Sequence, residues 1–420
     1  MVQEQQTLSR VAIIGAGAAG CFCAIEIKRR MPSCEVIVLE GGRKPLAKVA
    51  ITGGGRCNLT NSFAGIGNLS QAYPRGTQLM KRALMRFSQK DTWRWFENAG
   101  VPLTLQDDCC VFPQSQDAMD IVRTLEHLMR KAGVKVLCCH RVRSVADNGG
   151  SYSISFEDDS IPAIDCDKLV VTTGGSPKLG GLSFLDPLDL TVEEPVPSLF
   201  TFNIDDSSLK SLMGAVVEDV SVSIPGTKFT ASGPLLVTDW GLSGPAVLKL
   251  SSYAARYLAE CSYSSQIKVS WLGTSNENEI IAMLSGMAAD NGKKLVSSIY
   301  PPALSSRIWS HLISRAALRS DIRWSELGSK GMARMGSVLA SDTYHISGRC
   351  HFKGEFVTCG GVSLSNIDIR TLETKKHPGL FFAGEVLDVD AITGGFNLQA
   401  AWSMGYIVAS TICGDGSSSC

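Results

Sequence analysis

The sequence lacks the features that would direct a protein to nucleic acid, to a membrane or to export. Its 40 basic and 40 acidic residues give a formal net charge of zero, and neither sign is gathered into a block. Attraction to a polyanion or to an anionic bilayer therefore has no electrostatic support. No apolar run approaches the roughly 20 residues that span a bilayer, and residues 1–10 lack the apolar core of a signal peptide. We expect a soluble, cytoplasmic protein without nucleic-acid or membrane partners.

The sequence also lacks any C-x-x-C pair, although it contains 14 cysteines. This spacing gives no support for zinc ligation or for a thioredoxin-type dithiol, and we predict no metal site. Cys57 is the single candidate for a redox thiol. We interpret most of the cysteines as small buried hydrophobic residues.

A glycine fingerprint follows the first apolar run of the chain. Residues 11–14 lead into Gly15-Ala16-Gly17-Ala18-Ala19-Gly20, after which the pattern is helical. Gly15 permits a tight turn, Gly17 lets the backbone approach a pyrophosphate, and Gly20 lets the helix pack on the strand. Phosphate oxygens would meet free N–H groups at the helix N-terminus, around Ala18 and Ala19.

A carboxylate ends the next apolar run. Residues 36–39 stop at Glu40, twenty residues after the last glycine of the fingerprint. At the tip of a second strand, Glu40 would accept hydrogen bonds from a ribose diol and would repel a 2′-phosphate. Strand, glycine loop, helix and acid together predict a dinucleotide-binding site rather than a glycine turn that binds nothing.

Further strand ends with glycine stand far along the chain. Residues 168–172 run into Thr173-Gly174-Gly175, and residues 378–383 run into Gly384-Glu385. Thr393-Gly394-Gly395 then opens a helix of small residues. The carboxyl ends of parallel strands meet at one edge of a sheet, where ligands bind. A nicotinamide dehydrogenase needs only the first set of motifs, so a second set predicts an extended cofactor, FAD.

Residues 44–61 contain the unusual run Gly53-Gly54-Gly55-Arg56-Cys57-Asn58. Three consecutive glycines destabilise any regular element, and we expect a loop whose backbone approaches a ligand closely. Arg56 and Asn58 would supply hydrogen-bond donors to phosphate, ribityl or substrate oxygens. The alternative interpretation is a flexible surface loop.

The remaining pattern predicts an interrupted α/β domain. Two helices over 77–99, a helix over 115–132 and a strand over 134–137 indicate strand–helix–strand crossovers and a parallel sheet. From about residue 195 short β-rich runs appear, followed by a more helical stretch. The length of 420 residues fits two to three domains. We predict a nucleotide-binding domain in two segments, 1–194 and 345–420, and an insert over 195–344 that is part barrel or sandwich and part helical.

Several of these motifs resemble those of the BaiN/YhiN-like flavoproteins, a family that also includes aminoacetone oxidases. The resemblance is carried by the Gly15 fingerprint, residues 51–61, Cys359-Gly360-Gly361-Val362 and residues 379–405. It implies an α/β fold with a Rossmann-type FAD-binding domain of the glutathione-reductase kind, interrupted by a β-barrel plus helical domain. That implication agrees with the division of the chain predicted above.

The resemblance also assigns cofactor contacts. For the ADP half of FAD it implies Gly15, Gly17, Gly20, Glu40 and Val142. For the pyrophosphate, ribityl chain and flavin ring it implies Lys48, Gly53, Gly54, Gly55, Arg56, Asn58, Gly384, Asp388, Gly395, Asn397 and Leu398. We add to this expected set the neighbours in the same loops, which are Ala18, Ala19, Thr173, Gly174 and Glu385.

The expected activity is that of an FAD-dependent oxidoreductase with hydride transfer at flavin N5. Members of the resembling family either oxidise small amines or reduce conjugated double bonds with NADH or NADPH as transient electron donor, and the residues leave both open. A flavin-dependent RNA-modifying protein and a non-catalytic FAD-bound sensor are the alternatives to a small-molecule enzyme. We assign no catalytic residue among the equal candidates Arg56, Tyr344, His345 and His351, and we assign no oligomeric state.

Overall fold

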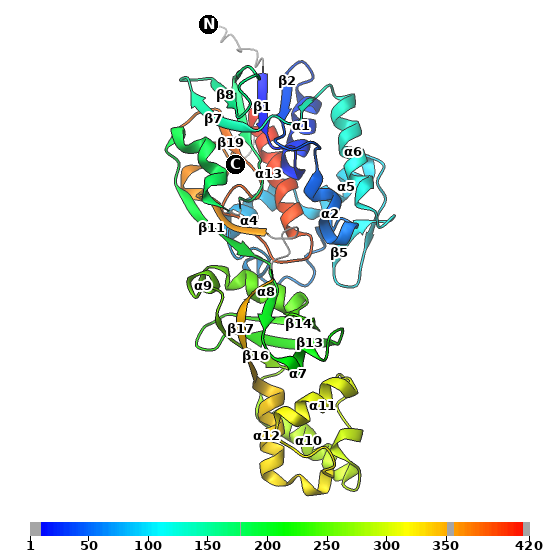
Figure 1. Cartoon of the computed structure of the whole chain (residues 1–420). Coiled ribbons are helices and arrows are strands. Elements are labelled where there is room, and N and C mark those ends of the chain that lie inside the picture. The colour runs from blue at the N-terminus through cyan, green and yellow to red at the C-terminus, as the bar shows by residue number, and fades with distance from the viewer. Residues whose placement is uncertain (1–9, 177, 351–356, 415–420) are drawn as a thin grey trace. The chain divides into compact units, whose positions relative to one another are not determined.

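The computed structural model describes residues 10–176, 178–350 and 357–414. The chain divides into two compact units, shown in Figure 1. The first, which we call the sheet unit, comprises Met1–Val196 and Val357–Cys420. The second, the inserted unit, is Pro197–Phe356. Each is described separately below.

A parallel five-stranded sheet forms the centre of the sheet unit, in the order β19-β10-β1-β2-β6. Its strands are β1 (Arg10–Ile14), β2 (Glu35–Leu39), β6 (Lys135–Leu137), β10 (Lys168–Val171) and β19 (Leu380–Phe382). The apolar runs are fully buried in β1, β2 and β10, as expected for a parallel sheet that is covered on both faces. The last strand of the chain therefore joins the same sheet as the first.

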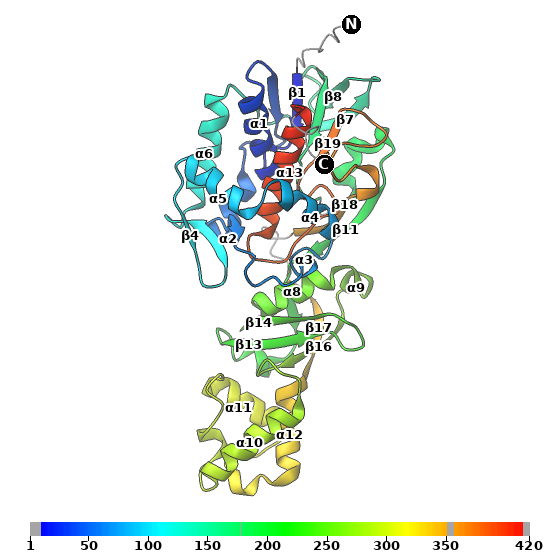
Figure 2. The ribbon, with the colours of Figure 1, turned by 180° about the vertical axis from the view of Figure 1, so that it is seen from behind.

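Two helices from opposite ends of the chain pack against each other beside this sheet. These are α1 (Ala18–Arg30) and α13 (Phe396–Ile412), which lie side by side in Figure 1 and, seen from behind, in Figure 2. A Cβ atom on Gly405 would lie 2.9 Å from the carbonyl oxygen of Ala19. The absence of a side chain at Gly405 thus sets how closely the two helices approach.

The other elements of the sheet unit cover the sheet or extend from it. The helices are α2 (Ala47–Gly55), α3 (Leu69–Ala72), α4 (Thr77–Arg86), α5 (Gln89–Asn98) and α6 (Ala118–Lys131), with 3₁₀ helices at Leu179–Leu188 and Leu364–Asn366. Small sheets are formed by β3 (Thr60–Asn61), β5 (Cys110–Pro113) and β4 (Leu103–Leu105), by β7 (Val142–Asp147), β8 (Tyr152–Phe156) and β9 (Ile164–Cys166), and by β11 (Val192–Ser198) and β18 (Val357–Val362).

The inserted unit is a closed six-stranded barrel with helices, and one hydrophobic core runs through it. The barrel order is β12 (Phe202–Ile204), β15 (Gly241–Ser243), β14 (Thr230–Val237), β13 (Val216–Ser223), β16 (Ser265–Ser270) and β17 (Asp342–Arg349). The helices are α7 (Ser207–Lys210), α8 (Pro245–Tyr253), α9 (Ala255–Glu260), α10 (Glu277–Asn291), α11 (Ser306–Arg315) and α12 (Gly328–Ser341), with 3₁₀ helices at Val296–Ser298 and Trp324–Glu326.

Two sequence-based expectations need correction. The return to the first domain at residue 345 is wrong, because β17 pairs with β12 and β16 and closes the barrel, so the inserted unit runs to Phe356. The expectation of a loop throughout 44–61 is also wrong, because the segment begins as helix α2 and leaves helical geometry at Thr52. No helix of the described residues is long and apolar enough to cross a bilayer.

Candidate cofactor site

The glycines of the fingerprint have different surroundings, and these indicate different roles. A Cβ atom on Gly15, whose φ is +106°, would lie 2.5 Å from the carbonyl oxygen of Thr172, and one on Gly20 would collide with the carbonyl oxygen of Gly15. A Cβ atom on Gly17 would have no heavy atom of the described chain within 4 Å. Gly15 and Gly20 are therefore required by packing, whereas Gly17 borders open space where a ligand would approach.

The N-terminus of α1 is suited to an anion. Gly17 is its N-cap residue, no side chain caps the helix, and no acidic residue lies in the first turn. The first N–H groups of a helix have no partner within the helix, and the helix dipole favours negative charge there. Ala18 and Ala19 thus lie where a pyrophosphate would be held.

Glu40 is fixed against the same glycine loop. It follows β2 directly, and its two carboxylate oxygens accept hydrogen bonds from the N–H groups of Ala16 (3.0 Å) and Gly42 (2.7 Å). A carboxylate offers about four lone-pair sites, so acceptor capacity remains for ribose hydroxyls. The N–H of His140 bonds to the carbonyl oxygen of Glu40 at 2.8 Å, which brings the start of β7 at Val142 beside this acid.

The triple-glycine segment presents open backbone. Gly53, Gly54 and Gly55 all have left-handed φ values, +60°, +67° and +82°. Cβ atoms on Gly54 and Gly55 would meet no heavy atom of the described chain within 4 Å. Left-handed geometry with empty space on the side-chain side is what close approach of a ligand to the backbone requires.

Arg56 and Asn58 differ in their availability. The Arg56 guanidinium lies over the Phe112 ring, 4.5 Å from its centroid, and is 3.5 Å from Gln116 Oε1. The side-chain oxygen of Asn58 is buried and has no hydrogen-bond partner among the described residues. A buried acceptor without a donor is costly and points to a missing ligand. Because Asn58 Oδ1 would also lie 2.6 Å from a Cβ on Gly395, this acceptor faces the start of α13.

The loops after β10 and β19 meet at the carboxyl edge of the sheet. A Cβ atom on Gly384 would lie 3.2 Å from Ala19 Cβ, so this loop touches α1. A Cβ atom on Gly174 would lie 4.0 Å from both Lys48 Nζ and Glu385 Oε2, and Thr173 beside it is exposed. Lys48 and Glu385 are themselves 3.6 Å apart. The expected residues of four separate segments are therefore brought together here.

Segment 59–61 makes two hydrogen bonds to α13 and one to the glycine loop before it. Trp402 Nε1 donates to the carbonyl oxygen of Leu59 at 3.0 Å, and the side chains of Thr60 and Gln399 are joined at 2.5 Å. Asn61 Nδ2 donates to the carbonyl oxygen of Gly394 at 2.9 Å. These bonds hold α13 and the glycine loop before it against residues 59–61, which follow the triple-glycine segment in the chain.

Three expected residues near α13 are only partly accessible to a cofactor. The Asn397 amide is engaged with the backbone of Ala391, accepting from its N–H at 3.0 Å and donating to its carbonyl oxygen at 3.1 Å. A cofactor contact from Asn397 would therefore come from its backbone. Asp388 and Leu398 are half-buried in the same region.

An ion pair that the sequence did not predict shapes this region. Arg75, just before α4, pairs with the fully buried Asp390 in the loop between β19 and α13. A Cβ atom on Gly76 would collide with Val389, which shows how tightly the two segments fit. No local pattern signals a pair separated by 315 residues.

The candidate proton donors lie in different places. Tyr344 and His345 are on β17 in the inserted unit, and His351 lies outside the described residues. Burial raises the pKa of Cys57 to about 12, so its thiol stays protonated and is unsuited to the redox role considered for it. In the described part of the chain no group of three or more His, Cys, Asp or Glu residues is placed to hold a metal ion.

The site fits FAD on two observations of this structure. Open space lies beside Gly17, Gly54 and Gly55, where an extended cofactor would pass the backbone. The buried acceptor of Asn58 also requires a donor, which ribityl hydroxyls or a flavin N–H would provide. The assignment of each contact to a part of FAD is a prediction.

The chain is similar to a known protein family and to characterised proteins over most of its length. Residues 9–411 match the HI0933-like protein Rossmann domain. The ribosomal RNA dihydrouridine synthase of Escherichia coli is 30% identical, over 94% of this chain and 96% of that protein. The 3-dehydro-bile acid delta(4,6)-reductase of Clostridium scindens is 26% identical, over 95% of this chain and 98% of that protein.

The fold is shared with a solved flavoenzyme structure. The 3-ketosteroid delta1-dehydrogenase of Sterolibacterium denitrificans matches with a TM-score of 0.50 and 11% identity, over 96% of this chain and 99% of that one. The structural similarity confirms the expected fold class. The family match and the relative from Clostridium scindens confirm the resemblance to the BaiN/YhiN-like flavoproteins and the class of enzyme, an FAD-dependent oxidoreductase. The chain belongs to the HI0933-like family of Rossmann-domain proteins.

Proposed function

We propose that this protein reduces a carbon–carbon double bond conjugated with a carbonyl group, with NADH or NADPH as the electron donor. The observation that carries this proposal is a chemistry common to the named activities of two relatives. A delta(4,6) bile acid with a 3-oxo group contains such a conjugated system, and dihydrouridine is uridine whose C5=C6 bond, conjugated with the C4 carbonyl, has been reduced. This shared chemistry favours the reductase over the amine oxidase that the sequence left open.

When bound, FAD supplies a hydride acceptor and donor at N5. The chain's own residues would hold it from both ends. The N-terminus of α1 and the backbone at Gly17 would bind the pyrophosphate, and Glu40 would accept from the ribose. Asn58 would accept a hydrogen bond from the ribityl chain or the ring. The uncapped N-terminus of α13 would favour negative charge on the pyrimidine side of the ring.

A small molecule is the substrate class that we favour. The formal net charge of zero gives no general attraction to the phosphate backbone of RNA. A uridine within ribosomal RNA is the second candidate, because the relative from E. coli is named for that substrate and aligns with nearly the whole chain. Both substrates would present the same conjugated carbonyl group to the site.

The test of the reaction uses the full chain loaded with FAD under anaerobic conditions. NADH or NADPH should bleach the flavin absorbance, and a conjugated enone added afterwards should restore it. The saturated ketone of the same skeleton is the control and should leave the flavin reduced. Bleaching of the oxidised flavin by a small primary amine, with no reoxidation by any enone, would replace the reductase by an amine oxidase.

The two substrate classes can be distinguished by which electron acceptor reoxidises the reduced flavin. A fragment of ribosomal RNA and a free enone are compared for reoxidation of the reduced flavin, and the RNA is then analysed for dihydrouridine. Reoxidation by the free enone alone supports a small-molecule substrate. Reoxidation by RNA alone, together with a shift of RNA mobility on binding, would assign the chain to RNA modification. No reoxidation by either acceptor would leave FAD with a structural or sensing role.

A further inference from the structure

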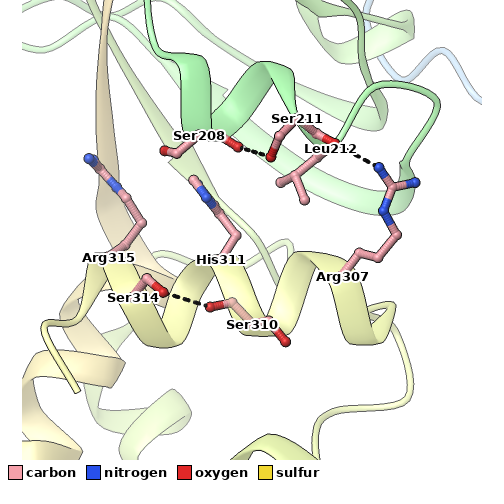
Figure 3. A pocket seen from close by; sticks show the side chains of 8 residues that line it. All are labelled: Ser208, Ser211, Leu212, Arg307, Ser310, His311, Ser314 and Arg315. Atoms are coloured by element: carbon pink, nitrogen blue, oxygen red, sulfur yellow. Dashed lines mark hydrogen bonds between the residues drawn. The ribbon is translucent and has the colours of Figure 1, made fainter. Parts of the chain in front are cut away.

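A cavity of about 520 Å³ lies between α7 and α11 in the inserted unit. Five of its lining residues come from α11 at spacings of three, four, seven and eight residues, so they share one face of that helix. That face consists of two arginines, two serines and a histidine, and Figure 3 shows Arg307 and His311 directed toward α7. The lining residues are Ser208, Ser211, Leu212, Arg307, Ser310, His311, Ser314 and Arg315.

Two guanidinium groups flank the cavity, with His311 between them (Figure 3). Arg307 donates one hydrogen bond, to the carbonyl oxygen of Ser211 at 2.8 Å. Arg315 donates two to Asp342 Oδ1, at 3.0 and 2.6 Å, and one to the carbonyl oxygen of Thr343 at 2.9 Å. A guanidinium has five N–H donors. Donors of both arginines thus remain for a ligand.

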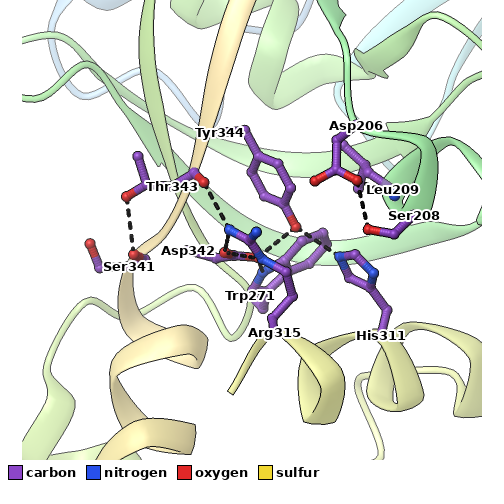
Figure 4. A network of polar contacts seen from close by, with 10 residues as sticks. All are labelled: Asp206, Ser208, Leu209, Trp271, His311, Arg315, Ser341, Asp342, Thr343 and Tyr344. Carbon is purple, nitrogen blue, oxygen red and sulfur yellow. Dashed lines mark hydrogen bonds and ion pairs between the residues drawn. The ribbon is translucent and has the colours of Figure 1, made fainter. Parts of the chain in front are cut away.

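Asp342 sets the direction of the hydrogen bonds beside the cavity (Figure 4). Its carboxylate is buried beside Arg315 and also accepts a bond from Trp271 Nε1 at 3.2 Å. An ionised carboxylate only accepts, so the 2.5 Å bond from Tyr344 Oη to Asp342 Oδ2 uses the proton of the phenol. Burial raises the pKa of Tyr344, which keeps this proton in place.

The orientation of Tyr344 fixes the protonation of His311. Because the Tyr344 hydroxyl gives its proton to Asp342, its oxygen accepts the bond from His311 Nε2, which is 3.0 Å away. The proton of the neutral imidazole therefore sits on Nε2, and Nδ1 has a free lone pair. His311 is only 8% exposed, and its Nδ1 has no hydrogen-bond partner in the described part of the chain.

The formal charges around the cavity cancel while His311 is neutral. Arg307 and Arg315 are offset by Asp342 and by Asp206, which caps α7 by accepting from the N–H of Leu209 at 3.0 Å. Burial lowers the pKa of His311, so the ring is neutral at pH 7. An anion would therefore be bound favourably only if a proton came with it. That proton would lie between the anion and Nδ1.

We propose that this cavity binds the phosphate group of a small phosphomonoester, with one proton shared between a phosphate oxygen and His311 Nδ1. Arginine forks match phosphate oxygens in geometry and in donor character. The hydroxyls of Ser208, Ser211 and Ser314 already donate to Asp206 or to backbone carbonyl oxygens, so the two arginines are the donors that a phosphate would use. A phosphomonoester loses its second proton near pH 6, so it supplies the shared proton at little cost, whereas a phosphodiester has no such proton. The volume leaves room for an organic group beside the phosphate. This site is independent of the reductase function proposed above.

The experiment is a calorimetric titration of the full, FAD-loaded chain with inorganic phosphate, uridine 5′-monophosphate and an oligouridylate without terminal phosphates. We expect the first two to bind and the third not to bind. Arg307→Ala should weaken binding about tenfold or more, the effect of losing one charge-assisted bond. Arg334→Ala is the matched control, because this exposed arginine also bonds to a single carbonyl oxygen, that of Ala317, outside the cavity.

Proton sharing has its own readout. His311→Gln should weaken monophosphate binding and reduce the dependence of binding on pH between 5.5 and 8, leaving only the part that comes from ionisation of the phosphate itself. In the unmodified chain affinity should increase as the pH falls. Binding that is unchanged in both Arg307→Ala and His311→Gln would place the phosphate elsewhere and overturn the proposal. Binding of the oligouridylate alone, or of none of the three compounds, would also overturn it.

Discussion

Among single residues, Glu40 has the most direct expected effect on the cofactor. Glu40→Gln keeps the size of the side chain but removes the charge that strengthens its bonds to a ribose, and it leaves one of the N–H groups of Ala16 and Gly42 without an acceptor. FAD affinity should fall by about 1.5–3 kcal/mol, roughly ten- to a hundredfold. Quenching of flavin fluorescence during titration of the apoprotein measures this change.

Glu35→Gln is the control for that variant. Glu35 lies at the other end of β2, where it pairs with Arg10 and Lys135 at the surface. Its loss should leave the dissociation constant of FAD unchanged. Equal affinities in Glu40→Gln and in the unmodified protein would mean that the carboxylate serves only to hold the glycine loop.

The burial of His311 should make the free energy of unfolding of the chain depend on pH. The charged and titratable groups around it are Asp206 on α7, Arg315 on α11, and Asp342 and Tyr344 on β17. Burial lowers the pKa of His311 in the folded state, so the unfolded chain binds a proton near pH 6.5 that the folded chain does not. Its contribution to the free energy of unfolding is therefore complete above about pH 6.5 and is lost as the pH falls below that value.

The measurement compares urea unfolding at pH 7.5 and pH 5.5. His311→Gln should lose less stability over this interval than the unmodified protein, because it has no proton to gain there. The difference between the two losses isolates His311 from the other histidines. A variant that loses as much stability as the unmodified chain would show that this ring is protonated equally easily in both states.

At the scale of single elements, a substitution in the triple-glycine segment can test whether the segment contacts the cofactor without disturbing contacts within the protein. A side chain at Gly54 meets no heavy atom of the described chain within 4 Å, so Gly54→Val adds only the cost of its left-handed φ of +67° to the apoprotein. That cost is roughly 1–2 kcal/mol. If the segment runs along the cofactor, the valine will collide with it, and FAD should be lost while the apoprotein stays folded.

Bound flavin per chain and the thermal midpoint of the apoprotein measure the two effects. Arg56→Ala is the contrasting variant, since it removes a cation near Phe112 without adding bulk. It should retain FAD but slow flavin reduction or reoxidation. Full retention of FAD in Gly54→Val would mean that the segment is a surface loop that does not contact the cofactor.

The sequence predicted those parts of the site that a short pattern within a single segment marks, such as an apolar run followed by glycine. The Gly15–Gly20 loop, Glu40 and the glycines after β10 and β19 lie at the predicted strand ends, because apolar runs and glycines mark those ends directly. The Arg75–Asp390 pair gave no such signal, since each residue alone is an ordinary charge. The partnerless oxygen of Asn58 could not be predicted either, because it depends on the approach of α13 from the far end of the chain.

At the scale of the whole molecule, a domain boundary could also be predicted only where a local pattern marks it. The change in texture near residue 195 lies close to the start of the inserted unit at Pro197. The end was placed too early, because the role of β17 is set by its partners β12 and β16 and not by its own sequence. A closing strand of a barrel is recognised only once the other strands are paired.

The corrected boundaries allow the two units to be separated. Val196 and Val357 lie on β11 and β18, which are hydrogen-bonded neighbours in a two-stranded sheet, so a short linker can replace residues 197–356. The expected FAD contacts all belong to the sheet unit, and the shortened chain should bind FAD with little change in affinity. We expect substrate recognition to require the inserted unit, so the shortened chain should lose turnover.

Flavin content, FAD affinity and anaerobic reoxidation by an enone test this prediction together. Loss of FAD binding in a chain that is otherwise folded, as judged by circular dichroism, would show that the inserted unit contributes to the cofactor site. Retained turnover would place the substrate site on the sheet unit instead. In either case the phosphate cavity between α7 and α11 is removed with the insert, so monophosphate binding should disappear whatever happens to the flavin.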